Sequence, residues 1–246
     1  MTPEITLRTF TDDQYVLDKV FYANNYRLKK FPEDEKVVIV DVGAHTGFFS
    51  LLCAMRGADH IYCVEPFTDN FRVLNKNLEA FNDRVTALKM GVYTENKFAN
   101  ISHPVPENNF YFLSQLEFHN GSEEPSDMAY FTTLDELLGG INDEKVTLLK
   151  IHIGYAESDI LLSSNSLDKC DFICGETNAP EEKLRELIAG MGEKGFKDSF
   201  LAEAKEQKGT HIILFAKNKC EDLFTLYASG EPSDEGVSPP SLQQQD

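Results

Sequence analysis

The chain has 246 residues, of which 41% are hydrophobic, and a formal net charge of −18 from 41 acidic and 23 basic residues. A surface this acidic repels phosphate groups, which argues against general nucleic-acid binding and against binding to anionic membrane surfaces. No run approaches 18 consecutive apolar residues, and residues 1–14 contain no apolar stretch of the signal-peptide type. We therefore expect no membrane-spanning helix and a cytoplasmic protein.

The five cysteines lie mostly in apolar runs and show no CxxC spacing. This pattern argues against both a disulfide framework and a structural zinc site, and it favours small buried side chains in a reducing compartment. No cluster of His, Cys and Asp has the spacing of metal ligands, so we expect no metal site. The cysteines are Cys53, Cys63, Cys170, Cys174 and Cys220.

The first hundred residues alternate between strand and helix patterns. A lead-in segment, residues 1–36, is expected to be partly helical over 18–31. Short β-branched runs bounded by turn residues predict buried strands, and apolar residues at helical spacing predict helices. The expected elements are a strand at 37–42, a helix at 48–57, a strand at 60–66, a helix at 68–81 and a strand at 85–93. This order predicts a parallel sheet covered on both faces.

The second half is less regular at first. Residues 94–131 contain three prolines and turn-rich stretches, with short strands expected within them, including 130–133. Beyond them we expect helices at 134–138, 157–162 and 180–190, strands at 146–153 and 170–177, and an antiparallel pair at 197–204 and 211–218. Residues 229–246 are rich in Pro, Ser, Gln and acids, which predicts a disordered tail after a main domain spanning 37–228.

The stretch VVIVDVGAHTGFFSLL places Asp41, Gly43 and Gly47 on a turn between a buried strand and a helix. Glycines permit positive φ or a close approach of the backbone to a ligand, and the helix N-terminus offers unpaired N–H groups. A dinucleotide fingerprint would need glycines at positions 45 and 48, where His45 and Phe48 stand. The pattern therefore argues against a nicotinamide cofactor.

Glu65 ends the second strand, 18 residues after Gly47. A carboxylate at this position accepts hydrogen bonds from ribose hydroxyls in this class of fold. A ligand with a ribose but no pyrophosphate fits both features, and S-adenosylmethionine (SAM) is the leading candidate. The alternative is a glycine turn that merely packs a helix on a strand.

From about Tyr26 to Lys217 the chain resembles the FkbM-type SAM-dependent methyltransferases. The resemblance rests on DVGAHTG at 41–47, VEPF at 64–67, TTLDELL at 132–138 and LLKIHIGYAESDIL at 148–161. It implies a seven-stranded methyltransferase sheet, with five parallel strands and a final antiparallel hairpin, and methyl transfer that is usually to a hydroxyl oxygen. The candidate cofactor-binding residues are Asp41, Gly43, Ala44, His45, Gly47, Glu65, Pro66 and Gly91.

The fourth-strand motif departs from the family pattern. Lys150 and Glu157 fit it, but His152 stands where the family has aspartate, at the strand end that faces the acceptor in this fold. A histidine that titrates near neutral pH is suited to accept the proton of a hydroxyl. The candidate catalytic residues are therefore His152, Glu176 and Asp135. Each also has a structural interpretation: a histidine capping a strand, a solvated strand end and a helix N-terminal acid.

Three functions remain open at this point. The first is O-methylation of a hydroxyl on a small molecule or a glycan. The second is a binding or scaffold protein that keeps the methyltransferase fold without catalysis, which the altered motif and the acidic tail favour. The third, a nicotinamide enzyme, is disfavoured by the glycine pattern.

Overall fold

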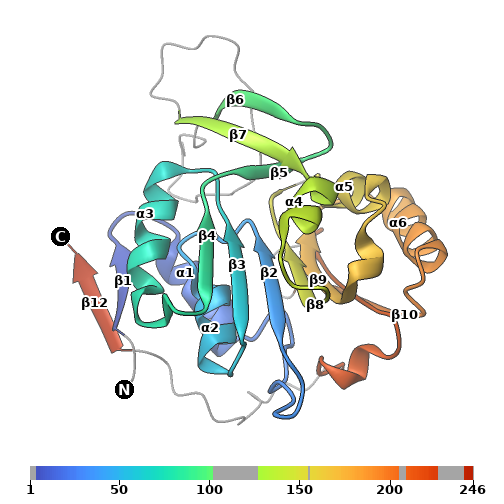
Figure 1. Ribbon diagram of the computed structural model, residues 1–246, viewed down its shortest axis with the longest axis horizontal. Helices are drawn as coiled ribbons and strands as arrows, with labels where there is room; N and C mark the ends of the chain where they lie inside the picture. Colours follow the sequence, from blue (N-terminus) through green and yellow to red (C-terminus); the bar gives the residue numbers. More distant parts are fainter. Residues whose placement is uncertain (1–3, 102–126, 155, 205–208, 227–240, 246) are drawn as a thin grey trace.

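The computed structural model describes residues 4–101, 127–154, 156–204, 209–226 and 241–245. Its centre is a seven-stranded sheet of order β10-β11-β9-β8-β2-β3-β4 (Figure 1). Five neighbouring strands are parallel, and the sheet ends in an antiparallel hairpin, as predicted: β11 runs antiparallel to β9, and β10 runs antiparallel to β11. In chain order the strands are β2 (Val38–Val42), β3 (His60–Val64), β4 (Val85–Leu88), β8 (Val146–Ile151), β9 (Cys170–Thr177), β10 (Asp198–Glu203) and β11 (His211–Ala216).

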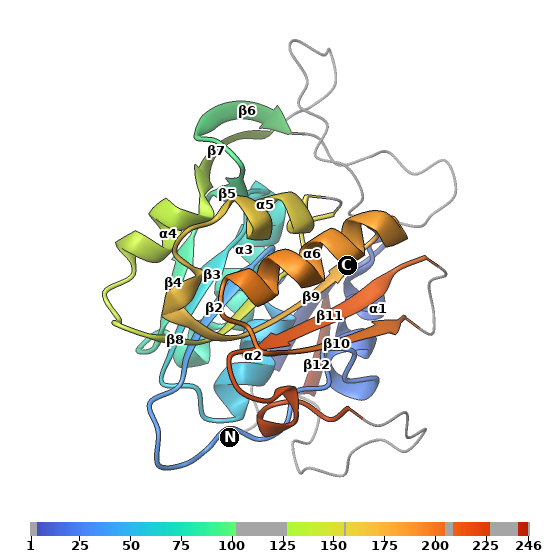
Figure 2. The same ribbon diagram turned by 90° about the vertical axis from the view of Figure 1, so that its right-hand side faces the viewer.

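Helices cover both faces of this sheet (Figures 1 and 2). Side chains alternate between the faces, so Ile39 packs with α2 and α3 while Val38 and Val40 pack with α4, α5 and α6. The helices are α2 (Phe48–Met55), α3 (Thr68–Asn77), α4 (Leu134–Gly140), α5 (Glu157–Ser163) and α6 (Glu181–Glu193), with short 3-10 turns at Glu79–Phe81, Leu167–Lys169 and Cys220–Asp222. In the part of the chain described, no helix combines the length and the apolar character that crossing a membrane requires.

The strand order reverses direction between β2 and β8. The chain runs outward from β2 through β3 to β4, and then returns to place β8 on the other side of β2. Open parallel sheets bind ligands at such a reversal, outside the carboxyl ends of the strands. The loops that follow β2 and β8 meet there, because the His152 N–H donates to the Val42 carbonyl at 3.1 Å.

The lead-in segment contains β1 (Glu4–Arg8), α1 (Asp13–Leu17) and η1 (Asp18–Tyr22), a π-helical turn. Its helical part therefore begins and ends earlier than the predicted 18–31. Strand β1 pairs in parallel with β12 (Ser241–Gln245). Residues 241–245 of the predicted tail form this strand, whose pairing is made by backbone groups and needs no apolar side chains. The other tail residues from 229 onward lie outside the described residues.

A second difference concerns the predicted strand 85–93. The chain leaves the main sheet after β4, and β5 (Gly91–Tyr93) joins β7 (Asp127–Thr133) and β6 (Lys97–Ile101) in a separate three-stranded sheet. The short strand predicted at 130–133 is confirmed within β7. Residues 102–126 of the irregular stretch lie outside the described residues.

Candidate active site

The loop after β2 is shaped by backbone contacts. Gly43 has φ +77° and Gly47 has φ +86°, conformations that favour glycine. A Cβ on Gly43 would lie 2.1 Å from the carbonyl oxygen of His152. Gly43 and the buried Ala44 both donate their N–H to the Val64 carbonyl at 3.0 Å. The glycine at 43 is thus required by the approach of the β8 end, where the sequence suggested the approach of a ligand.

Asp41 and Lys150 form a buried ion pair beneath this loop. Lys150 Nζ lies 2.9 Å from Asp41 Oδ1 and donates a hydrogen bond to the Gly43 carbonyl at 2.7 Å. Ser50 donates to the other carboxylate oxygen at 2.7 Å. Asp41 therefore holds the loop through Lys150, a residue that belongs to the family motif but that the sequence did not single out as a site residue.

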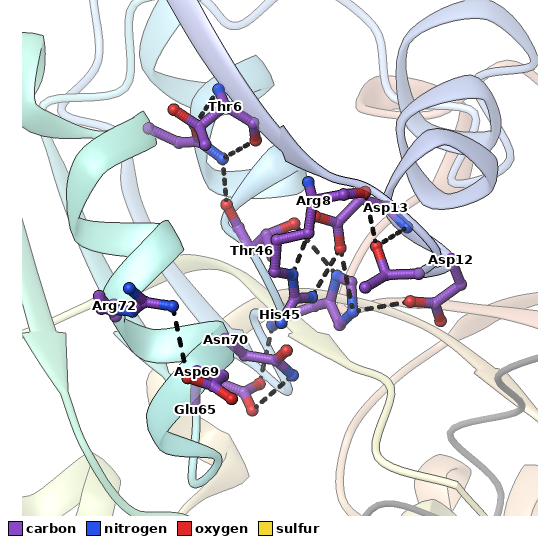
Figure 3. A network of polar contacts seen from close by, with 12 residues as sticks. Thr6, Arg8, Asp12, Asp13, His45, Thr46, Glu65, Asp69, Asn70 and Arg72 are labelled. Atoms are coloured by element: carbon purple, nitrogen blue, oxygen red, sulfur yellow. Dashed lines mark hydrogen bonds and ion pairs between the residues drawn. The ribbon is translucent and has the colours of Figure 1, made fainter. Parts of the chain in front are cut away.

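Glu65 lies at the carboxyl end of β3 and is 3% exposed. Its Oε2 accepts from the His45 N–H at 2.8 Å, and its Oε1 accepts from Asn70 Nδ2 at 3.1 Å (Figure 3). The Phe67 N–H also donates to Oε1 at 3.1 Å. Burial raises the pKa of this carboxyl above its usual value, against the opposing effect of His45 and these hydrogen bonds. Pro66, buried beside it, fixes the turn.

Asn70 provides an unused acceptor next to Glu65. The side chain is 1% exposed, and its Oδ1 has no hydrogen-bond partner among the described residues. A buried amide oxygen without a donor costs free energy, which a ligand hydroxyl would recover.

The His45 ring faces the lead-in segment. Its Nε2 lies 3.3 Å from Asp12 Oδ1 and 4.0 Å from Asp13 Oδ1, while its main chain has φ +53° (Figure 3). Arg8 holds Asp13 through contacts of 2.6 and 3.0 Å. Ligand atoms of Asp12, Asp13 and His45 lie within 4.8 Å of one another, a spacing that suits a metal ion. Because Arg8 already neutralises Asp13, we interpret the group as an ion-pair cluster that ties the lead-in segment to the loop.

His152 and Glu176 come together at the carboxyl ends of β8 and β9. His152 Nε2 lies 4.0 Å from Glu176 Oε2, and the histidine side chain is 25% exposed. Tyr26 Oη lies 3.0 Å from His152 Nδ1, and Lys19 Nζ donates to Glu176 Oε2 at 2.7 Å. The lead-in segment thus contributes two side chains that the sequence did not indicate, because nothing in its local pattern marks them.

The electrostatic setting of His152 differs from the expected one. Burial lowers its pKa to about 4, with Glu176 opposing the change and Lys150 adding to it. This direction differs from the titration near neutral pH that the sequence suggested. Glu176 shows the reverse balance: burial favours its neutral form, but the charges of His152 and Lys19 outweigh that effect and lower its pKa. At neutral pH the pair is an uncharged imidazole beside a carboxylate.

Two predicted site residues have structural roles. The Asp135 carboxylate accepts hydrogen bonds from Ser164 Oγ at 2.5 Å and from the N–H groups of Asn165 and Ser166 at 2.9 and 3.1 Å. These partners lead into the amino end of β9, the end opposite Glu176, so Asp135 does not join the catalytic candidates. A Cβ on Gly91 would lie 2.2 Å from the Phe131 ring, so this glycine makes room for a core side chain.

Comparison with known proteins identifies the family. The model of the FkbM methyltransferase domain matches residues 41–198. The chain belongs to the FkbM methyltransferase family. The matched residues contain the loop after β2, Glu65, His152 and Glu176.

Similarity to curated proteins is confined to a short region. The FkbM protein is 38% identical over 90 residues to the probable protein arginine N-methyltransferase 1.2 of Arabidopsis thaliana. These 90 residues cover 36% of this chain and 21% of that protein. Protein arginine N-methyltransferase 1.1 of the same plant is 37% identical over 90 residues. The match spans about a fifth of each relative's length.

Solved structures with a similar arrangement include the human methyltransferase 10 domain containing protein, with a TM-score of 0.49, 13% identity and coverage of 82% of this chain and 81% of that one. The N-terminal domain of human METTL16, in complex with SAH, has a TM-score of 0.44, 12% identity and coverage of 83% and 68%.

Proposed function

We propose that this FkbM protein transfers the methyl group of SAM to a hydroxyl oxygen of a small molecule or a glycan. The observation that carries the proposal is a buried carboxylate oxygen without a partner, Oε1 of Glu176, at the carboxyl edge of the sheet. Glu176 is 1% exposed, and no described residue donates to this oxygen. A buried acceptor of this kind suits the O–H group of a substrate.

The residues at the loop after β2 fit a SAM ligand. Asn70 donates through Nδ2 to Glu65, and its Oδ1 has no donor among the described residues, so that Oδ1 and the remaining lone pairs of Glu65 suit ribose hydroxyls. We assign the cofactor to the loop residues Gly43–Gly47 and to Glu65. When bound, SAM supplies a methyl group made electrophilic by a positively charged sulfur.

The charges around the acceptor end are paired. Lys150 neutralises Asp41, Lys19 neutralises Glu176, and His152 is uncharged at neutral pH. A site whose ion pairs are complete attracts neither a cation nor an anion strongly, and it therefore suits an uncharged hydroxyl. The net charge of −18 further disfavours a nucleic-acid substrate.

All five cysteines are free and buried, in keeping with the proposed cytoplasmic location.

Methyl transfer to a hydroxyl requires that a proton leave the oxygen. His152 and Glu176 border the exposed side of this edge and form the pair that orients the hydroxyl and takes up its proton. A weak base suffices, because the hydroxyl becomes strongly acidic as its oxygen gains the methyl group. General acid–base participation of this kind contributes about 10²–10⁴-fold to rate.

The test combines binding and transfer. Calorimetric titration should show SAM and S-adenosylhomocysteine binding, and transfer from SAM is then assayed on monosaccharides, oligosaccharides, phenols and alkylamines. We expect methyl ethers as products. We also expect His152→Ala and Glu176→Gln each to lower turnover at least tenfold while SAM affinity stays within threefold. Glu182→Gln, at an exposed position of α6, is the matched control.

Three results would change the proposal. Methylated amines without methyl ethers would refute the hydroxyl acceptor. SAM binding without transfer to any acceptor would favour the scaffold alternative. Absence of SAM binding at millimolar ligand would refute the cofactor site.

A further inference from the structure

We propose that Tyr26 and Lys19 of the lead-in segment are positioning residues, which make His152 a hydrogen-bond donor and leave Glu176 as the group that takes the acceptor proton. The inference rests on the proposed function and deepens it. It divides the roles within the pair and assigns them to side chains outside the matched family domain.

The first step concerns the hydroxyl hydrogen of Tyr26. Tyr26 is 6% exposed, and its ring packs edge-on against Phe49 of α2. Among the described residues its hydroxyl has one hydrogen-bonding neighbour, His152 Nδ1, at 3.0 Å. A buried O–H without an acceptor is costly, so the Tyr26 hydrogen is directed to Nδ1.

The second step follows from the chemistry of neutral imidazole, which carries one N–H and one lone pair. Because Nδ1 accepts from Tyr26, the hydrogen of His152 lies on Nε2. That N–H faces Glu176 Oε2 across 4.0 Å, an attractive arrangement at a distance too long for a direct hydrogen bond. The opposite tautomer would turn a lone pair toward the carboxylate and leave the Tyr26 hydrogen without an acceptor.

The third step concerns Glu176. Lys19 is 8% exposed and donates to Oε2 at 2.7 Å, which favours the ionised carboxylate and leaves Oε1 without a partner among the described residues. The protonation state of Tyr26 fits these roles. Burial, together with the negative charges of Glu176, Asp41 and Glu157, raises the pKa of Tyr26 well above its usual value, so the phenol stays neutral.

These contacts define the proton's route. The acceptor O–H donates to Glu176 Oε1, while His152 Nε2–H points at the acceptor oxygen. A lone pair of that oxygen would bond the methyl carbon of SAM as the methyl–sulfur bond breaks, and the electron pair of that bond would stay on the sulfur of the departing S-adenosylhomocysteine. The acceptor O–H bond would then break, with its electron pair staying on the oxygen. The proton forms a bond with Oε1, which converts Glu176 to the neutral acid. His152 remains neutral throughout.

The tautomer is directly measurable without any acceptor. Long-range ¹H–¹⁵N spectra of the full-length protein with ¹⁵N-labelled histidine distinguish the protonated ring nitrogen, and His152→Asn assigns the His152 signal among the six histidines. We expect the wild type at pH 7 to carry the hydrogen on Nε2. Tyr26→Phe should remove this preference, while Tyr22→Phe, an exposed position of the same segment, should preserve it.

Titration of the same signal provides a second measurement. The charged or titratable groups that face His152 are Tyr26, Glu176, Lys150, Lys19 and His45. Lys19→Met removes a positive charge, and Tyr26→Phe removes a donor to the neutral ring, so both should raise the pKa of His152 from about 4. Lys36→Met, which removes an exposed lysine that precedes β2, should leave it unchanged.

Kinetics then separate the two roles. With a hydroxyl acceptor from the panel, Glu176→Gln should lower turnover about 10²–10⁴-fold. His152→Asn supplies a replacement N–H and should stay within about tenfold of the wild type, and Tyr26→Phe should lose about five- to tenfold. A wild-type hydrogen on Nδ1, or a loss with Asn as large as with Ala, would overturn the inference. Either result leaves the proposed O-methyl transfer intact. Absence of transfer with the expected tautomer would instead refute the proposed function and the proton-accepting role of Glu176, while the assignment of the His152 tautomer to Tyr26 would stand.

Discussion

Two carboxylates at opposite ends of β9 show how the structure separates stabilising charges from functional ones. At the amino end, Asp135 is surrounded by donors from Ser164, Asn165 and Ser166. At the carboxyl end, Glu176 is buried with one oxygen unpartnered among the described residues. A complete set of donors indicates a group that holds the fold, and an incomplete one indicates a group that awaits a ligand.

Residues at the carboxyl edge of the main sheet also differ in whether their polar atoms have partners. Among the described residues, Asn70 and Glu176 each retain an acceptor there with no donor beside it. Asp41 Oδ1 also lacks a hydrogen bond, but it faces Lys150 Nζ at 2.9 Å, and Ser50 donates to the other oxygen of Asp41. Position at the functional edge is therefore not sufficient to make a residue a ligand-binding one. The comparison predicts that Asp41 and Lys150 act on stability first.

Lys150→Met should have the largest effect. It leaves Asp41 buried and without its counter-charge, which costs about 3–5 kcal/mol of unfolding free energy. Urea denaturation at neutral pH measures this loss. Lys145→Met removes an exposed partner of Asp171 and should cost at most about 1 kcal/mol. Equal losses of unfolding free energy in the two variants would show that the buried ion pair stabilises the protein no more than an exposed one.

Gly43→Ala should come next. The new Cβ would meet the His152 carbonyl, and alanine is strained at positive φ, so we expect about 2–4 kcal/mol of destabilisation with weaker SAM binding. Gly139→Ala in α4 meets nothing within 4 Å and should be neutral or slightly stabilising. Weakened SAM binding with unchanged stability would instead assign Gly43 to ligand contact.

Glu65→Gln tests the incomplete group nearest the proposed ribose. Loss of the charge should weaken SAM binding about tenfold, because hydrogen bonds to a charged acceptor are the stronger ones. Calorimetric titration measures the change, with the exposed Glu79→Gln as its control. Unchanged affinity would show that the protein donors around Glu65 already satisfy it fully.

The sequence predicted the sheet well, because buried parallel strands and their helices leave strong periodic patterns. It placed Asp41, Gly43 and Glu65 at the ends of the first two strands of the sheet, where the structure has them. It could not find Tyr26 or Lys19, since their partners lie more than a hundred residues away and no local pattern links them. It also could not foresee the lowered pKa of His152, which arises from burial by segments distant in the chain.

The break between β4 and β5, at Lys89 and Met90, shows another limit of prediction from the sequence. One apolar run continues through VTALKMGVY, yet the chain turns there into a second sheet. The turn depends on β7, whose Phe131 ring occupies the space above Gly91. Periodicity within one segment carries no information about which partner strand it meets.

Asp135→Asn should have the smallest effect and tests the complete group. The hydrogen bonds from Ser164, Asn165 and Ser166 lower the pKa of Asp135, outweighing the opposite effect of burial. A carboxyl with a lowered folded-state pKa stabilises the protein above its unfolded pKa of about 3.9, and this contribution is lost as the pH falls through the folded-state value. At pH 7 the variant should therefore lose about 1 kcal/mol of unfolding free energy, and its difference from the wild type should shrink steadily below about pH 4. Urea denaturation across this range measures the trend, with the exposed Asp168→Asn as the matched control. Because Asp135 lies away from the carboxyl edge, SAM affinity should not change. A loss of SAM binding or of methyl transfer at unchanged stability would return Asp135 to the active site and break the distinction between the two ends of β9.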